Sequence, residues 1–228
     1  MPEIALPSMS NYQSTQSGGL LAVGQSAQRL QEICRNIDTF WQQWSVTPLW
    51  LSPLRLGASE TEHPQQVISA HTGGKLAHAA CLPFFDELND NTPTIYAGFN
   101  TAHRLEPLRP LDPTSRFECF HVAEVIIVGD KAFCEQSYQM VRDELGTFLE
   151  GYVAGRWHRS NDSFMNEMTT KEEWVVGSGA YTLAVASGND HGQHFLGRRG
   201  LAGESRCLGI GIERLFTAIQ RFAKTQEN

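Results

Sequence analysis

The sequence predicts a single α/β domain, of the α+β kind, in which helices flank a largely antiparallel sheet. This prediction rests on three helix-like segments, at 24–44, 131–152 and 212–224, with strand-like segments of mixed spacing between them. The chain has 228 residues, 41% of them hydrophobic, so it can bury one sizeable core. We divide it into a flexible tail at 1–20 and one domain at 21–228.

The elements follow from local patterns in chain order. Leu30, Ile33, Ile37 and Trp41 recur at helical spacing, and Pro48 then begins an extended segment. The later elements are a strand, proline-rich turn and returning strand at 104–128, an amphipathic helix at 131–152, strands at 172–177 and 180–187, a glycine-rich loop, a strand at 205–211 and a final helix at 212–224.

Residues 205–217 place small side chains and a cation together. In a strand, alternate residues share a face, so Cys207, Gly209 and Gly211 leave room there for a flat ligand. Arg214 follows at the entrance of the helix. Glycine in a strand also marks close packing or a bulge, so the pattern alone leaves both interpretations open.

The returning strand carries charges on one face. That face holds Arg116, Glu118, Phe120, Val122 and Glu124, and the opposite face holds Phe117, Cys119, His121 and Ala123. Charged side chains that point into an interior must be paired or bound to something. The alternative is an edge strand with a solvated face.

Together these residues resemble motifs 2 and 3 of the class II aminoacyl-tRNA synthetase catalytic domain. The match to motif 2 comprises Arg104, Glu106, the loop at 107–115, Arg116, Phe120 and Glu124. The match to motif 3 comprises Gly209, Gly211, Glu213 and Arg214, with Cys207 in place of the first glycine.

That cysteine is similar to one in the seryl-tRNA-synthetase-like amino acid:carrier protein ligases, which are related to atypical archaeal seryl-tRNA synthetases. The resemblance implies a zinc ion held by Cys81, Glu124 and Cys207. The segment SGNDHGQHF also resembles this family, at Ser187, Asn189, His191, His194 and Phe195. The resemblance covers roughly residues 25–222, and the combined spacing is more specific than any single motif.

The proposed metal site is chemically consistent. Thiolates and a carboxylate suit Zn²⁺, and three protein ligands with an open fourth position are typical of a catalytic site. The open position can accept the α-amino group of a small amino acid. Five cysteines in an acidic chain without a secretion signal favour a reducing, cytoplasmic location. Cys34, Cys119 and Cys134 are interpreted as small buried hydrophobic residues.

The resemblance also implies roles for the remaining residues. Arg104 would bind the α-phosphate of ATP and the amino acid carboxylate, Arg116 the β- and γ-phosphates, and Arg214 the γ-phosphate and the adenine face. Glu106 would contact the adenine side, Glu118 would help to hold Mg²⁺, and Phe120 and Glu213 would complete the ATP site. Arg104, Glu106 and Arg214 are the expected catalytic residues, and Asn189, His191 and Gly209 are the expected amino acid pocket.

These expectations define an activity and its partners. We expect ATP-dependent activation of a small amino acid as an aminoacyl-adenylate, followed by transfer to the phosphopantetheine thiol of a carrier protein. Gly188 and Gly192 are taken to leave space for a small substrate. A formal charge of −7 argues against a nucleic-acid surface, so tRNA is an unlikely acceptor. No apolar run approaches a membrane span. The segment from 24 through Pro48 resembles motif 1 and implies a homodimer.

Three alternatives stay open. The chain could be an inactive paralogue that serves as a binding or regulatory subunit. It could activate an amino acid for another acceptor, such as a peptide or a small molecule. A zinc hydrolase that uses Cys81, Glu124 and Cys207 is disfavoured, because no general base pairs obviously with them.

Overall fold

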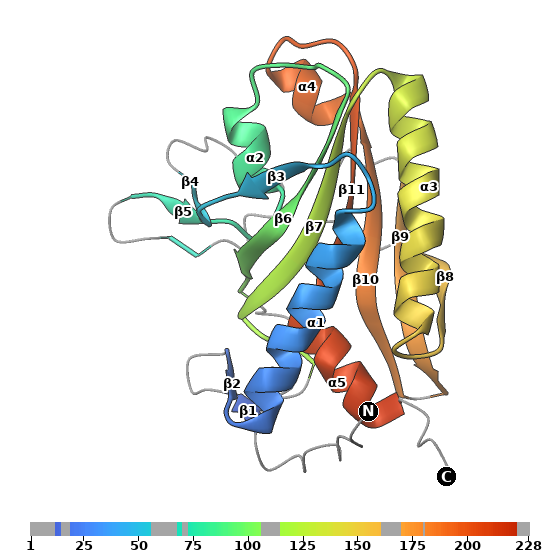
Figure 1. Ribbon diagram of the computed structural model, residues 1–228. Coiled ribbons are helices and arrows are strands. Elements are labelled where there is room, and N and C mark those ends of the chain that lie inside the picture. The colour runs from blue at the N-terminus through green and yellow to red at the C-terminus, as the bar shows by residue number, and fades with distance from the viewer. Residues whose placement is uncertain are drawn as a thin grey trace.

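A computed structural model describes residues 12–14, 19–55, 68–69, 73–105, 115–160, 170–179 and 181–222. Its centre is a seven-stranded sheet (Figure 1). From one edge to the other, the strands are β3 (Thr47–Trp50), β6 (Thr94–His103), β7 (Cys119–Gly129), β11 (Glu204–Gly211), β10 (Tyr181–Gly192), β9 (Thr170–Ser178) and β8 (Gly155–Ser160). β3 pairs with β6 in parallel, and the other neighbouring strands are antiparallel. The predicted fold class is confirmed.

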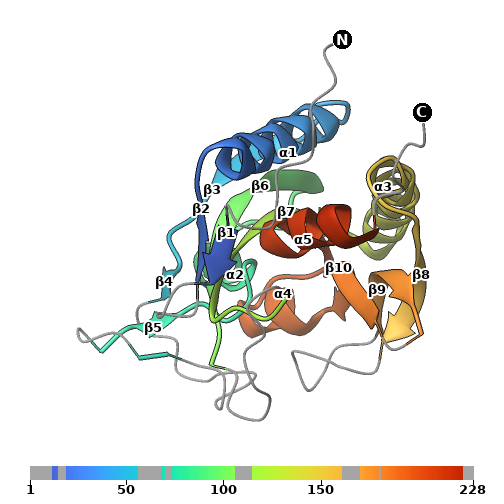
Figure 2. The same cartoon turned by 90° about the horizontal axis from the view of Figure 1, so that it is seen from below.

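Helices cover both faces of the sheet (Figure 2). One face carries α1 (Gln25–Trp41), α3 (Lys131–Glu150) and α5 (Ile212–Phe222), and the other carries α2 (Leu82–Glu87) and α4 (His194–Arg198). Two small two-stranded antiparallel sheets pair β1 (Tyr12–Ser14) with β2 (Leu20–Ala22), and β4 (Leu54–Arg55) with β5 (Lys75–Leu76). None of the described helices combines the length and the apolar character needed to cross a membrane.

The core consists of two clusters separated by the sheet. On β7, Val125 and Ile127 pack in the larger cluster with α1, α3 and α5, whereas Ile126 and Val128 pack in a smaller cluster with α2 and α4. Burial on both faces explains why this end of β7 is continuously apolar. The same strand exposes Cys119 to Val122 more fully, because the helices leave that end less covered.

The predicted helices match the structure to within a few residues, but two strand predictions were wrong. The first strand of the motif 2 hairpin is β6, which ends at His103, so Arg104 follows the strand rather than beginning it. The segment after residue 187 is no loop, because β10 continues to Gly192. A Cβ at Gly188 would overlap the Tyr138 hydroxyl on α3, so this glycine serves close packing between strand and helix.

Some predicted segments lie outside the described residues. They include the proline-rich part of the turn at 106–114, with Glu106, and most of the tail at 1–20. Within that tail, Tyr12–Ser14 pairs with Leu20–Ala22.

Candidate active site and metal centre

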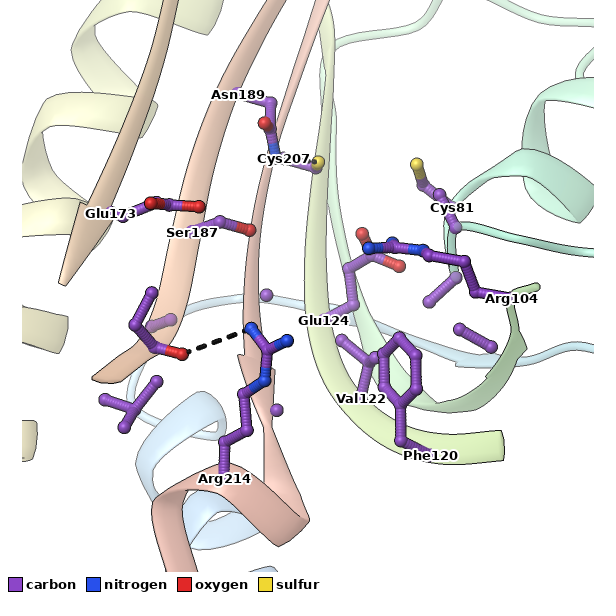
Figure 3. A pocket seen from close by; sticks show the side chains of 18 of the residues that line it. Cys81, Arg104, Phe120, Val122, Glu124, Glu173, Ser187, Asn189, Cys207 and Arg214 are labelled. Carbon is purple, nitrogen blue, oxygen red and sulfur yellow. Dashed lines mark hydrogen bonds between the residues drawn. The ribbon is translucent and has the colours of Figure 1, made fainter. Parts of the chain in front are cut away.

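A cavity of about 170 Å³ lies on the α2 side of the sheet (Figure 3). Its floor is a row of cross-strand partners: Glu124 on β7 lies opposite Gly209 on β11, which lies opposite Ser187 on β10, which lies opposite Glu173 on β9. Gly209 is the residue of this row that has no side chain. A Cβ there would lie 3.1 Å from Val122 Cγ1 and 3.9 Å from a Glu124 oxygen. Gly209 thus lines the cavity as predicted, and Val122 fills part of the space that a side chain there would need.

Cys81, His191 and Cys207 form a group that could hold a metal ion. One ligand atom from each lies within 4.8 Å of the others, and all three side chains are buried. Cys207 Sγ lies 3.4 Å from His191 Nε2 and accepts a hydrogen bond of 3.4 Å from Asn189 Nδ2. The other ring nitrogen of His191, Nδ1, lies 3.2 Å from Ser205 Oγ. A second partner of this kind fixes the ring orientation of a metal-ligating histidine.

Local structure presents these side chains to one point. Cys81 precedes the first turn of α2, where Pro83 favours the helix start, and its thiol does not cap the helix. Figure 3 shows that the Cys81 and Cys207 sulfurs lie at the same end of the cavity, together with Asn189. Asn189 and Cys207 are direct cross-strand partners, so the pairing of β10 with β11 sets their separation.

Burial keeps these groups neutral in the absence of a cation. It lowers the pKa of His191 to about 3 and raises the pKa of Glu124 to about 8. A hydrogen bond to Cys207, together with burial, raises the pKa of the Cys81 thiol. A neutral imidazole is the form that ligates metals, and a bound cation would favour ionised thiols and carboxylate.

The structure brings together most of the predicted metal site and adds one residue to it. Cys81 and Cys207 meet as predicted, whereas Glu124 lines the same cavity but lies outside the close group of metal-capable atoms. His191, which we assigned to the amino acid pocket, lies beside the two sulfurs. Ser187, Asn189 and His191 alternate within one strand, which places them on the same face. The sequence analysis predicted a loop after residue 187 and therefore missed this relation.

The other end of the cavity is cationic and aromatic. Arg104 donates from Nε and Nη2 to the His78 carbonyl oxygen at 3.2 and 3.0 Å, and its Cζ lies 5.5 Å from the centre of the Phe120 ring. Arg214 Nε donates to the Ser115 carbonyl at 2.8 Å, and Nη1 donates to the Ala184 carbonyl at 3.4 Å. Both arginines and Phe120 line the cavity, and Figure 3 shows Phe120 and Arg214 on opposite sides of it.

Other predicted residues are placed differently. Arg116 and Glu118 are absent from the described lining of the cavity, and Glu118 lies just before β7. Glu213 reaches the lining, but its carboxylate accepts hydrogen bonds from the backbone N–H of His121 at 3.0 and 3.1 Å.

The sequence interpretation missed the wall on β9 and β10. Lys171 and Glu173 form an ion pair of 2.9 Å on this wall, and Ser187 lies beside them. Gly188, in contrast, faces Tyr138 and Leu208 on the other side of the strand, so it leaves no space in the cavity.

Comparison with known proteins finds similarity in the fold but not in the sequence. No family model and no curated protein matches the chain. Among solved structures, it is similar to a cytoplasmic serine-tRNA ligase from Naegleria fowleri in complex with AMP, with a TM-score of 0.77 and 12% identity over 93% of this chain and 58% of that one. The chain has a class II synthetase-like fold.

Two prolyl-tRNA synthetases support the same fold. The enzyme from Giardia lamblia, in complex with prolyl-adenylate, matches with a TM-score of 0.74 and 12% identity over 89% of this chain and 48% of its own length. The enzyme from Cryptosporidium parvum, complexed with halofuginone and AMPPNP, matches with a TM-score of 0.71 and 11% identity over 90% and 48%. The class II synthetase-like chain therefore spans about half the length of these proteins.

Proposed function

We propose that the protein activates a small amino acid with ATP and transfers the aminoacyl group to the phosphopantetheine thiol of a carrier protein. One observation carries this proposal: a single cavity joins a cationic and aromatic end, at Arg104, Phe120 and Arg214, to a buried group of thiols and imidazole at the other end. The first end suits a nucleotide, because guanidinium groups pair with phosphates and stack on aromatic rings.

The residues at the second end fit zinc. Two thiols and a neutral imidazole are ligands that Zn²⁺ prefers, and their burial protects the site from water. Cys81, His191 and Cys207 would hold the ion, whereas Glu124, which the sequence predicts as a ligand, lines the same cavity outside this group. A bound zinc would supply a position that accepts a free α-amino group.

The first step then follows from where the chain's charged groups lie. With the amino group at the thiol end and the carboxylate at Arg104, a carboxylate oxygen can attack the α-phosphorus of MgATP. The bond to the leaving pyrophosphate breaks, and aminoacyl-AMP forms. Arg104 would offset charge at the α-phosphate, and Arg214 would hold the nucleotide. Catalysis of this kind depends on positioning and on preorganised charge.

In the second step, a carrier thiolate attacks the carbonyl carbon of the adenylate, a thioester forms and AMP leaves. The net charge of −7 supports a protein thiol rather than tRNA as the acceptor. The wall formed by Lys171, Glu173 and Ser187 supports a small substrate with a polar side chain or none, because a large apolar side chain would cover the ion pair without replacing its contacts with water.

We further propose that the protein forms a homodimer through the β3 edge of the sheet. β3 pairs only with β6 among the described strands, and Trp50 on it is 89% exposed. An exposed tryptophan on an edge strand is typical of an interface. Light scattering should give a dimer mass, and Trp50→Glu should shift it toward the monomer.

Pyrophosphate exchange into ATP tests the central proposal. We expect exchange with at least one of glycine, alanine and serine, and a metal content of about one zinc per chain in the same sample. Adding carrier protein with and without its phosphopantetheine arm then tests the acceptor. The absence of exchange with all twenty amino acids, in a sample that contains zinc, would favour a binding subunit instead.

A further inference from the structure

The contact between Glu213 and His121 links two residues of the nucleotide end of the cavity. Glu213 is the second residue of α5 and directly precedes Arg214, while His121 lies on β7 and directly follows Phe120. Phe120 and Arg214 both line the cavity, on opposite sides of it (Figure 3). Any change in the distance between residues 121 and 213 therefore changes the gap between the aromatic ring and the guanidinium.

The contact exists because the chain leaves the sheet at this point. β11 pairs with β7 as far as Gly211 and Val122, and α5 then begins at Ile212. The backbone N–H of His121 lies one residue beyond the last pair, so no strand carbonyl continues the ladder. Both Glu213 oxygens accept from this N–H, at 3.1 and 3.0 Å, and take the place of the next strand residue.

The imidazole strengthens the contact. His121 Nδ1 lies 2.6 Å from Glu213 Oε1, and the Glu213 side chain is 5% exposed, whereas that of His121 is 63% exposed. One carboxylate thus receives a backbone and a ring N–H from the same residue. This arrangement leaves Glu213 little capacity to bind a nucleotide directly, because its oxygens are already engaged.

We propose that Glu213 and His121 form a positioning clamp that sets the gap between Phe120 and Arg214, and thereby the affinity for the adenine nucleotide. The clamp rests on the proposed function, since it needs a nucleotide in the cavity. Glu213 and His121 are positioning residues in this proposal. They act through their chain neighbours, and neither needs to touch the substrate.

Direct binding of ATP to the full-length protein, measured by calorimetry, tests the clamp. His121→Ala removes the ring contact from an exposed position and should raise the Kd for ATP about three- to tenfold, the loss expected for one ordinary intramolecular hydrogen bond. Glu213→Ala should raise it further, and Glu213→Gln should recover part of the loss, because the amide oxygen can still accept from the backbone N–H. His158→Ala is the matched control, since it removes another exposed histidine, hydrogen-bonded to Arg156 on β8, and should leave the Kd unchanged.

Pyrophosphate exchange separates positioning from general damage. The KM for ATP should rise in His121→Ala while the KM for the amino acid and the melting temperature stay near those of the parent. An equal rise in both KM values would overturn the clamp, and so would an unchanged Kd for ATP in both His121→Ala and Glu213→Ala. A parent protein that binds no ATP would refute the proposed function itself, and the clamp with it.

Discussion

Gly188→Ala tests how closely β10 approaches α3. The added Cβ would overlap the Tyr138 hydroxyl and lie 3.1 Å from both Tyr138 Cζ and Leu208 Cδ2. Carbon atoms in contact are ordinarily about 3.5–4.0 Å apart, so the strand and the helix must separate by roughly 1 Å. Overpacking of this size costs about 1–3 kcal/mol.

The same displacement reaches the candidate site. Ser187 and Asn189 flank residue 188 and line the cavity, and Asn189 donates to the Cys207 sulfur. We therefore expect a fall in the melting temperature of about 2–12 °C. Pyrophosphate exchange should fall by about 100-fold, the cost of displacing positioned groups by 1 Å. Thermal unfolding and exchange on one preparation measure both effects.

Two further variants make this test specific. Gly197→Ala adds a Cβ on α4, where no atom lies within 4 Å, so it should leave stability unchanged or raise it by up to about 1 kcal/mol. Tyr138→Phe removes the atom closest to the added Cβ, so combining it with Gly188→Ala should restore most of the lost stability. Parental stability in Gly188→Ala alone would contradict the packing described for β10.

Four other predictions follow from the site. Cys207→Ser and the Cys81→Ser, Cys207→Ser double variant should lose zinc while the fold survives, and full zinc occupancy by elemental analysis would refute the metal assignment. Arg104→Lys and Arg214→Lys should each lower exchange by about 100-fold, because lysine keeps the charge and loses the planar guanidinium. Exchange at the parent rate in both variants would show that the nucleotide does not bind at this end of the cavity. Exchange should favour glycine, alanine or serine, so activation of phenylalanine or leucine with these three inert would contradict the proposed substrate class. A hydrogen bond to the buried Glu213 carboxylate raises the pKa of His121 above 6.5. The pair therefore stabilises the fold fully below pH 6.5, and this contribution is lost as the pH rises through the raised pKa. Urea unfolding should show that His121→Ala lowers the free energy of unfolding by less than about 1 kcal/mol at pH 6, because the ring is exposed, and by less at higher pH.

The sequence predicted those parts of the fold that have a strong local period. The stripe of Ile33, Ile37 and Trp41 is long enough to specify α1, and it packs in the core as expected. β6 and β8 lack such a signal. β6 is partly buried along most of its length, so its two faces differ little. β8 lies at a sheet edge and has a single large apolar residue, a tryptophan, which is too little to reveal a period.

The candidate site was predicted where residues alternate within one strand, as with Cys207 and Gly209. The side chains supplied by other strands could not be found in this way. Lys171 and Glu173 reach the cavity through the register of β9 with β10, which no local pattern encodes. The position of His191 beside Cys207 depends equally on the pairing of β10 with β11.

The separation of the metal-capable residues along the chain has a thermodynamic consequence. Cys81 and His191 lie 110 positions apart, so the unfolded chain would have to close a long loop before both could bind one ion. The ion would therefore bind the native state almost exclusively, and its concentration would enter the folding equilibrium as a stabilising ligand. Added zinc would then raise the melting temperature of a protein that also folds without it.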